Sequence, residues 1–370
     1  MTTMNKKLFN ASERTREPIS NANLLMYIAI GVFFVMYILA ILIWGGGYKK
    51  PQMVFDILGN NAFLITIACG LTIVMITGGI DISVGGVVGL VSMIGVMFLK
   101  ERFCSLEGMS NGMKVMLAAM ISIGVGLLFG LAQGWLIAYL NIQPFIVTLA
   151  GMFFARGMIT ILSPVPVQLT VKQDPELIKI LQHRVEVLWL GTLNKKGILN
   201  PAVIENGVFI ALLIVILTVL LLKKSKLGRH FYAVGGNSQS ALMLGINVKR
   251  TRFLAHLISS MLAGIAGFIY IMHTVSGNAT NANASEMDAI ASAIIGGTLL
   301  SGGVGNVIGT FFGVMILATI KSIVLASGLR EPWWQTITTG LLLCVFILLQ
   351  SIILSYRGKG RKQKDAIAKE

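Results

Sequence analysis

The chain has 370 residues, of which 55% are hydrophobic and only 12% are charged. With a mean hydropathy of +0.81, it carries too little charge to cover the surface of a soluble protein, so the lipid bilayer must be its main solvent. The net charge of +15 does not indicate nucleic-acid binding, because Lys and Arg stand in short clusters beside apolar runs, as membrane orientation signals do.

The first 23 residues are polar, and the apolar run after them is too long for the core of a signal peptide, so we interpret it as an uncleaved first span. A helix needs roughly 20 residues to cross a hydrocarbon core of about 30 Å. The candidate spans in chain order are Leu24–Trp44, Ala62–Thr77, Ile82–Leu99, Val115–Leu140, Pro144–Leu162, Val203–Leu222, Phe253–Val275, Met287–Leu300, Val307–Ser327 and Gln335–Ser355. Of these, Met287–Leu300 is short for a full crossing.

These segments predict an all-α polytopic membrane protein of about ten transmembrane helices, some of them short or broken. Residues 1–23 are expected to form a cytoplasmic N-terminal tail, residues 24–355 the transmembrane domain, and residues 356–370 a basic cytoplasmic tail.

Loop charges orient the predicted spans. The loop 223–252 carries seven Lys and Arg residues and no acidic residue, and the C-terminal tail is also rich in Lys and Arg. Because basic residues concentrate in cytoplasmic loops, we expect both termini and this loop to face the cytoplasm. Both termini can face the same side only if the number of spans is even, so Met287–Leu300 must cross the membrane as well. The loop 163–202, whose charges are mixed, is expected to face the outside.

One short motif occurs twice. Residues 77–85 (TGGIDISVG) align without gaps on residues 301–309 (SGGVGNVIG), and each copy follows one apolar segment and opens the next. Transporters often contain weak repeats with broken helices at matching positions, where the substrate passes. The alternative is that glycine-rich breaks recur by chance in a chain with 41 glycines.

The motifs of enzymes are missing from the sequence. The Gly-Lys pair at 358–359 lacks the rest of a phosphate-binding loop, the four histidines are scattered, and there is no nucleophile elbow. We therefore expect a protein that is not an enzyme and that binds no cofactor or metal itself.

Charged residues at membrane depth are costly and usually have a role. Asp81 is expected either to cap the helix that starts at Ile82 or to lie beside the substrate path, and the two roles are compatible. Arg156, in mid-span, should face the bundle interior or water and bind a carbonyl at a helix break or a sugar hydroxyl. We expect Arg156→Leu to fold and insert at least as well as wild type but to transport less. Ser83, Asp288 and Ser301 complete the candidates for the path.

The basic loop 223–252 contains a short apolar element. Asn237 or Ser238 can cap a helix there, and Gly245 supplies a left-handed stop. Between them lie Ala241 and the apolar run Leu242–Leu244. This element either rests on lipid as an interfacial helix or docks into the groove of a partner protein.

Three motifs, at residues 78–85, 233–237 and 296–305, resemble in order those of ribose/galactose/xylose-type ABC permeases, and so does the segment 288–292. The similarity runs from about residue 55 to residue 350. Residues 144–157 and the Pro332-Trp333-Trp334 triplet look most like the galactofuranose-permease branch.

This resemblance implies a permease subunit that brings a monosaccharide, a pentose or hexose such as galactofuranose, across a bacterial inner membrane. It also implies a second permease copy (homodimer or paralogous heterodimer), ABC ATPase subunits that bind ATP and Mg, and a periplasmic sugar-binding protein. Residues 237–245 would be the coupling helix that inserts into the ATPase. The family commonly has an acidic residue and two alanines where this chain has Gln239-Ser240-Ala241, so we expect the apolar tip to carry more of the docking.

Two other classes of function compete with this one. A secondary transporter or channel that works alone would need ion-binding carboxylates in the membrane, and Asp81, Glu205 and Asp288 are a thin set for that purpose. An intramembrane enzyme would need a nucleophile and base or a metal, and the sequence has no such constellation.

Overall fold

The computed structural model describes residues 21–103, 108–172, 174–193 and 199–367. Most of the predicted N-terminal tail, residues 1–20, and the last three residues of the predicted C-terminal tail lie outside this part of the chain. The described residues are mainly helical, with two small two-stranded sheets.

The helices are α2 (Asn21–Trp44), α3 (Gln52–Ile76), α4 (Ser83–Leu99), α5 (Asn111–Tyr139), α6 (Pro144–Leu162), α7 (Pro175–Leu181), α8 (Asn206–Lys224), α9 (Lys226–Gly236), α10 (Ser238–Met243), α11 (Val248–Thr274), α12 (Ser285–Ile295), α13 (Val307–Ala326) and α14 (Pro332–Ile367). Strands β2 (Arg184–Leu193) and β3 (Leu199–Glu205) pair as an antiparallel hairpin, and β1 (Val167–Gln168) pairs with β4 (Ser276–Gly277). Among the described residues, α2, α3, α5, α6, α8, α11 and α13 are long and apolar enough to cross a membrane.

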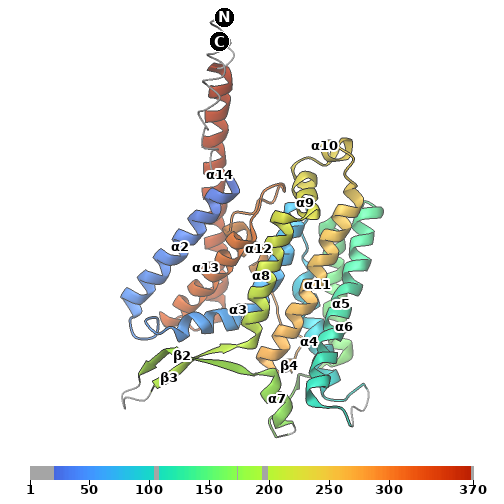
Figure 1. Cartoon of the computed structure of the whole chain (residues 1–370), viewed down its shortest axis with the longest axis vertical. Helices are drawn as coiled ribbons and strands as arrows, with labels where there is room; N and C mark the ends of the chain where they lie inside the picture. The colour runs from blue at the N-terminus through green and yellow to red at the C-terminus, as the bar shows by residue number, and fades with distance from the viewer. Residues whose placement is uncertain (1–20, 104–107, 173, 194–198, 368–370) are drawn as a thin grey trace, which may run out of the picture.

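The chain runs back and forth between two ends of the bundle (Figure 1). One end carries α10, and we call it the α10 face; the other carries α7 and the β2–β3 hairpin, and we call it the hairpin face. Helix α2 starts toward the α10 face (Figure 1), and there Leu25 lies against Gly297, just beyond the end of α12. Helix α14 ends at the same face, so the two ends of the described chain lie on one side.

The short span predicted at Met287–Leu300 is a broken one. Helix α12 has 11 residues, which is about 16 Å and only half of a hydrocarbon core. It packs antiparallel to α13, with the backbone of Gly296 against Gly309. The other half of the crossing is made by the non-helical chain at 275–284, which follows the end of α11 at the hairpin face. The segment therefore passes from one face to the other as loop plus short helix.

Several helices do not begin or end where the predicted spans do. Helix α3 begins at Gln52, ten residues before the apolar run, and the polar residues of its first turns lie at the hairpin face. The span expected from Val203 starts in strand β3, and the helix begins at Asn206. Helix α14 continues past Ser355 to Ile367, through residues predicted as a tail.

Helix α3 is at the centre of the bundle and α2, α5 and α6 are at its edge. In their most apolar windows 78% of the residues are buried for α3 but only 22% for each of the other three. Small residues allow close packing inside: Gly126 on α5 and Gly264 on α11 let the two backbones touch. Helix association in lipid relies on such contacts, because lipid tails are as apolar as the side chains.

The predicted repeat is visible in the structure. Helices α4 and α13 begin at the aligned residues Ser83 and Val307. The aligned glycines, Gly78 and Gly302, have φ values of +82° and +83°, a left-handed conformation that favours glycine. The two turns also touch, since a Cβ on Gly302 would lie 2.9 Å from the Cα of Gly78.

A third backbone segment, the end of α9, meets the two turns. A Cβ on Gly235 would overlap the carbonyl oxygen of Ile76 and lie 2.6 Å from the amide nitrogen of Gly303, whereas a Cβ on the adjacent Gly236 would meet nothing within 4 Å. We name this meeting of Ile76–Gly79, Gly235–Gly236 and Ser301–Gly305 the glycine junction.

The neighbouring glycines make a matched test of the glycine junction. We expect Gly235→Ala to lower the free energy of unfolding by about 1–3 kcal/mol, the usual cost of overpacking. Gly236→Ala should leave it nearly unchanged. Thermal unfolding of the purified protein in detergent measures both, and equal melting temperatures for the two variants would contradict the packing described here.

Candidate functional site

The break between α3 and α4 holds a buried carboxylate. Asp81 is 0% exposed. Its Oδ1 accepts a hydrogen bond from the backbone N–H of Ser83 at 3.1 Å, and its Oδ2 accepts one from the hydroxyl of Ser259 on α11 at 2.8 Å. The residue at the N-cap position is Ile82, which has no capping side chain. Asp81, one residue before the N-cap position, thus accepts a hydrogen bond from the first turn of α4. Through Ser259 it also links the helix break to α11.

More polar groups surround Asp81 than the sequence indicated. The hydroxyl of Ser83 lies 2.6 Å from Oδ1 of Asp81 and 3.0 Å from Oε1 of Gln133 on α5. The Nε2 atoms of Gln133 and of His256 on α11 are buried without a hydrogen-bond partner in the described part of the chain. Gln133 and His256 were missed; a polar side chain inside an otherwise apolar span is the signal that points to them.

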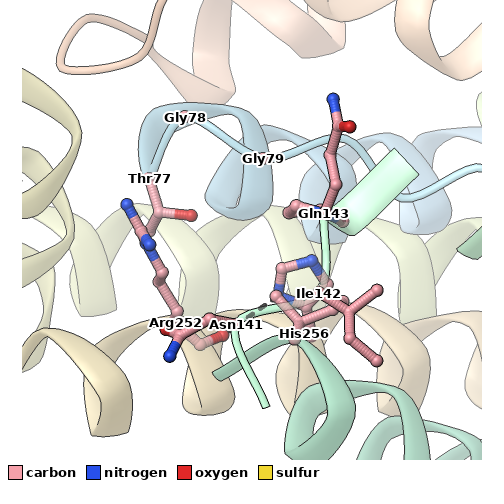
Figure 2. Close-up of a pocket in the computed structure, with 10 residues that line it drawn as sticks. Thr77, Gly78, Gly79, Asn141, Ile142, Gln143, Arg252 and His256 are labelled. Atoms are coloured by element: carbon pink, nitrogen blue, oxygen red, sulfur yellow. Dashed lines mark hydrogen bonds between the residues drawn. The ribbon is translucent and has the colours of Figure 1, made fainter. Parts of the chain in front are cut away.

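A pocket of about 250 Å³ opens beside this cluster. Figure 2 shows its walls: Gly78 and Gly79 from the helix break, the α5–α6 turn with Asn141 and Gln143, and α11 below. His256 lies in the floor, with Nδ1 3.0 Å from the carbonyl oxygen of Arg252. Because a carbonyl can only accept, this contact assigns a proton to Nδ1. The side chains of Asn141, Gln143 and Arg252 give the pocket both donors and acceptors.

Arg156 holds the loop that precedes α12. Its guanidinium donates to the carbonyl oxygens of Asn281 at 2.6 Å, Ala282 at 2.8 Å and Ala279 at 3.3 Å. These carbonyls are in the non-helical half of the broken span, where Ala282 and Ala284 have positive φ. The expectation that Arg156 binds carbonyls at a helix break is confirmed. In Arg156→Leu these carbonyls would lose their donors, so we now expect this variant to be less stable than wild type.

Near Arg156 lies Glu286, another residue that sequence reasoning missed. It is buried in the first turn of α12, and its Oε2 has no partner among the described residues. A Cβ on Gly85 would overlap this oxygen, so Gly85 is what allows the carboxyl to fit against α4. The acidic pair Glu286 and Asp288 beside a short apolar segment is the signal that could have found it.

The other two predicted path residues lie elsewhere. Asp288 forms an ion pair of 2.5 Å with Lys321 on α13. Ser301 is exposed in the second glycine turn, with its carbonyl oxygen facing Gly78. The structure thus brings Asp81 and Ser83 together at the first break and separates them from Arg156 and Asp288.

The three carboxylates that the sequence offered for a stand-alone ion-coupled transporter all have polar partners. Asp81 is bonded to two serines, Asp288 to Lys321, and Glu205 to Arg184 and His273. None of them is left as an open ion-binding oxygen cluster. No group of three or more His, Cys, Asp or Glu residues able to hold a metal ion occurs in the part of the chain that the structure describes.

Helix α10 lies at the end of the bundle beyond α9 (Figure 1). Its cap is Asn237 rather than Ser238, with Oδ1 accepting from the backbone N–H of Ser240 at 2.9 Å. Gly245 ends the element at φ +79°, as predicted. Leu242, Met243 and Leu244 are 58%, 87% and 79% exposed, whereas Ala241 is buried against the protein. We call the three exposed residues the α10 tip.

Helix α9 links the α10 tip to the helix breaks. The hydroxyl of Tyr232 donates to the carbonyl oxygen of Gly305 at 2.9 Å. Burial raises the pKa of Tyr232 above its ordinary value, so the hydroxyl stays protonated and keeps donating at neutral pH. Together with Gly235, this contact fixes α9 to the second glycine turn.

A bundle of apolar helices with two glycine-rich breaks and an exposed apolar tip is consistent with a transport permease. The family model described as the branched-chain amino acid transport system / permease component matches residues 53–347. The chain belongs to this permease family.

Curated relatives cover nearly the whole chain. It is 36% identical over 328 residues to the inner membrane ABC transporter permease protein YjfF of Escherichia coli, covering 89% of this chain and 92% of that protein. It is 32% identical to the fructose import permease protein FruG of Bifidobacterium longum (89% and 91%) and 32% identical to the ribose import permease protein RbsC of Bacillus subtilis (86% and 90%). No solved structure matches the chain. The resemblance to sugar ABC permeases is confirmed.

Proposed function

We propose that this permease imports a monosaccharide, a pentose or hexose, as the membrane-spanning subunit of an ATP-driven importer. The observation that carries the proposal is the similarity, over most of both chains, to permeases named for fructose and ribose import. The motifs at residues 144–157 and 332–334 make galactofuranose the first sugar to test.

Energy for transport is proposed to come from ABC ATPase subunits that bind ATP and Mg. The α10 tip supports this, because an apolar surface of three exposed side chains on a capped helix fits a groove in a partner. On the opposite face, a periplasmic sugar-binding protein would deliver the sugar. A second permease copy, identical or paralogous, would complete the membrane assembly.

The sugar is proposed to follow the broken helices. Asp81 and Ser83 support this at the first break, beside the pocket of Figure 2. Arg156 and the Asp288–Lys321 pair support it at the broken span. Ser301 belongs to the path through its place in the second glycine turn. Broken helices are where transporters commonly place their substrates.

The α10 face is proposed to be cytoplasmic, in a bacterial inner membrane. Its loop 223–252 carries seven basic and no acidic residues, and both ends of the described chain are on this side. We expect a cysteine replacing Lys362, in an otherwise cysteine-free chain, to resist an impermeant thiol reagent in intact cells. A cysteine replacing Lys172, in the loop between β1 and α7, should react. The reverse pattern would contradict the orientation.

The function is tested by uptake into proteoliposomes. The permease is reconstituted with the ATPase and binding protein encoded beside it, and labelled galactofuranose, ribose, xylose, fructose and galactose are supplied in turn. We expect ATP-dependent accumulation of at least one of them. Uptake of none of these sugars, with uptake of leucine or another branched-chain amino acid instead, would overturn the proposal.

A further inference from the structure

The hairpin face contains a second cavity, of about 270 Å³, at the far end of α11 from the pocket of Figure 2. Its walls are the first turns of α3, the start of β2, the end of β3 and His273 near the end of α11. One water needs about 10–15 Å³ of such space. The cavity therefore has room for a ligand the size of one sugar ring.

Helix α3 presents a polar stripe to this cavity. Gln52, Asp56 and Asn60 follow one another at intervals of four residues, so they lie on one face of the helix. All three line the cavity, together with Phe55. This stripe occupies the ten residues by which α3 extends beyond its apolar run, which the sequence analysis did not count as part of the span.

The walls are held in place by hydrogen bonds. Gln52 accepts from the backbone N–H of Val203 at 2.7 Å and donates to its carbonyl oxygen at 3.1 Å, which fastens α3 to β3. Glu205 accepts from Arg184 at 3.1 Å and lies 2.8 Å from Nδ1 of His273. The hairpin, α3 and α11 are thereby joined around the cavity before any ligand arrives.

Some polar atoms stay available after these bonds are counted. Oδ1 of Asp56 is bonded to Gln52, but its Oδ2 and the side-chain amide of Asn60 have no protein partner in the part of the chain that the structure describes. Arg184 keeps further N–H donors beyond its contact with Glu205. Acceptors and donors therefore face one space, and the ring of Phe55 adds an apolar wall.

Charge decides which kind of ligand fits. Asp56 and Glu205 are acidic and Arg184 is basic, so the cavity has no excess of positive charge for a phosphate or a carboxylate. Its acidic and imidazole groups do not converge into a metal site. A neutral molecule with many hydroxyls matches best, because each hydroxyl can donate and accept at once.

We propose that this cavity is a monosaccharide-binding subsite at the hairpin face, where Asp56, Asn60 and Arg184 bind the hydroxyls and Phe55 contacts the apolar side of the ring. The inference rests on the proposed function, which makes the ligand a sugar and the hairpin face the side of entry.

The test is direct binding to the full-length permease in lipid nanodiscs, without its partners. Ribose, xylose, fructose, galactose and galactofuranose are titrated singly up to millimolar concentration, and binding is followed by calorimetry. We expect at least one sugar to bind. Asp56→Asn and Asn60→Ala should each weaken its binding by about tenfold or more, as the loss of a hydrogen bond to a charged or well-aligned group predicts.

A matched control is Asp174→Asn, the same change at the start of α7 on the same face but outside the cavity. It should bind as wild type. The inference is overturned if no sugar binds, or if both cavity variants bind as tightly as the control. Sugar uptake by the complete importer without binding to the isolated permease would reject the subsite and leave the proposed function standing. Binding to the isolated permease without uptake by the complete importer would support the subsite and reject the proposed function.

Discussion

Replacing Leu242 and Leu244 together with aspartate is expected to release the ATPase from the permease while the permease stays in the membrane. Both side chains are mostly exposed at the α10 tip, so the folded permease loses no packing when they change. Apolar anchors at an interface typically cost about 2 kcal/mol or more each when removed. Two of them should weaken binding by nearly a thousandfold (~4 kcal/mol), which pull-down of the ATPase with the tagged permease measures.

The conservative pair Leu242→Met and Leu244→Met is the control, because it keeps the tip apolar and should retain the ATPase. Gly245→Val should also weaken binding, since a β-branched residue is poorly suited to φ +79°. If the aspartate variant recovers as much ATPase as wild type, the α10 tip is not the docking element. An interfacial helix on lipid would then explain its exposure.

Arg156→Leu is expected to destabilise the permease and to abolish most transport. The carbonyl oxygens of Asn281 and Ala282 belong to buried residues and would lose their donors. An unpaired buried polar group costs about 1–3 kcal/mol, so we expect the free energy of unfolding to fall by about 2 kcal/mol or more. Thermal unfolding in detergent and uptake into proteoliposomes measure the two effects.

Two further substitutions of Arg156 should differ from Arg156→Leu in how much stability and uptake they lose. Arg156→Lys keeps the charge but lacks the planar fork that reaches several carbonyls, so it should be intermediate. Arg156→Glu should be worst, because it places a carboxylate against carbonyl oxygens. Normal stability with lost uptake in Arg156→Leu would show that the side chain serves the sugar and not the loop. Wild-type values for both would contradict the role described here.

Much of the bundle could be predicted from local signals. Apolar length marks the long spans, the positive-inside rule places loop 223–252 and both ends on one side, and glycine with a capping Asn marks α10. Each of these features depends on residues close together in the chain. The same holds for the repeat, whose aligned turns have the same backbone conformation at Gly78 and Gly302.

Contacts between distant segments could not be predicted in this way. Arg156 and Asn281 are 125 residues apart, and Asp81 and Ser259 are 178 apart. The β2–β3 hairpin was expected only as a loop of mixed charge, because its alternation is too short and too polar to stand out beside long apolar runs. The first turns of α3 were missed for a related reason: Asp56 and Asn60 lower the hydropathy of a segment that is nonetheless helical.

The glycine junction has a mechanical consequence. At Gly235, Ile76 and Gly303 the main chains press on one another with no side chain between them, so the joint lacks the soft rotamers that absorb motion elsewhere in a packed core. If α10 is displaced and α9 moves with it, the backbone contacts at Gly235 would therefore transmit the movement directly to both glycine turns. The glycine junction also restricts substitution at Gly235. Any larger residue there would push the backbones of Ile76 and Gly303 away from α9, and no smaller side chain nearby could make room because the contacting atoms belong to the backbone.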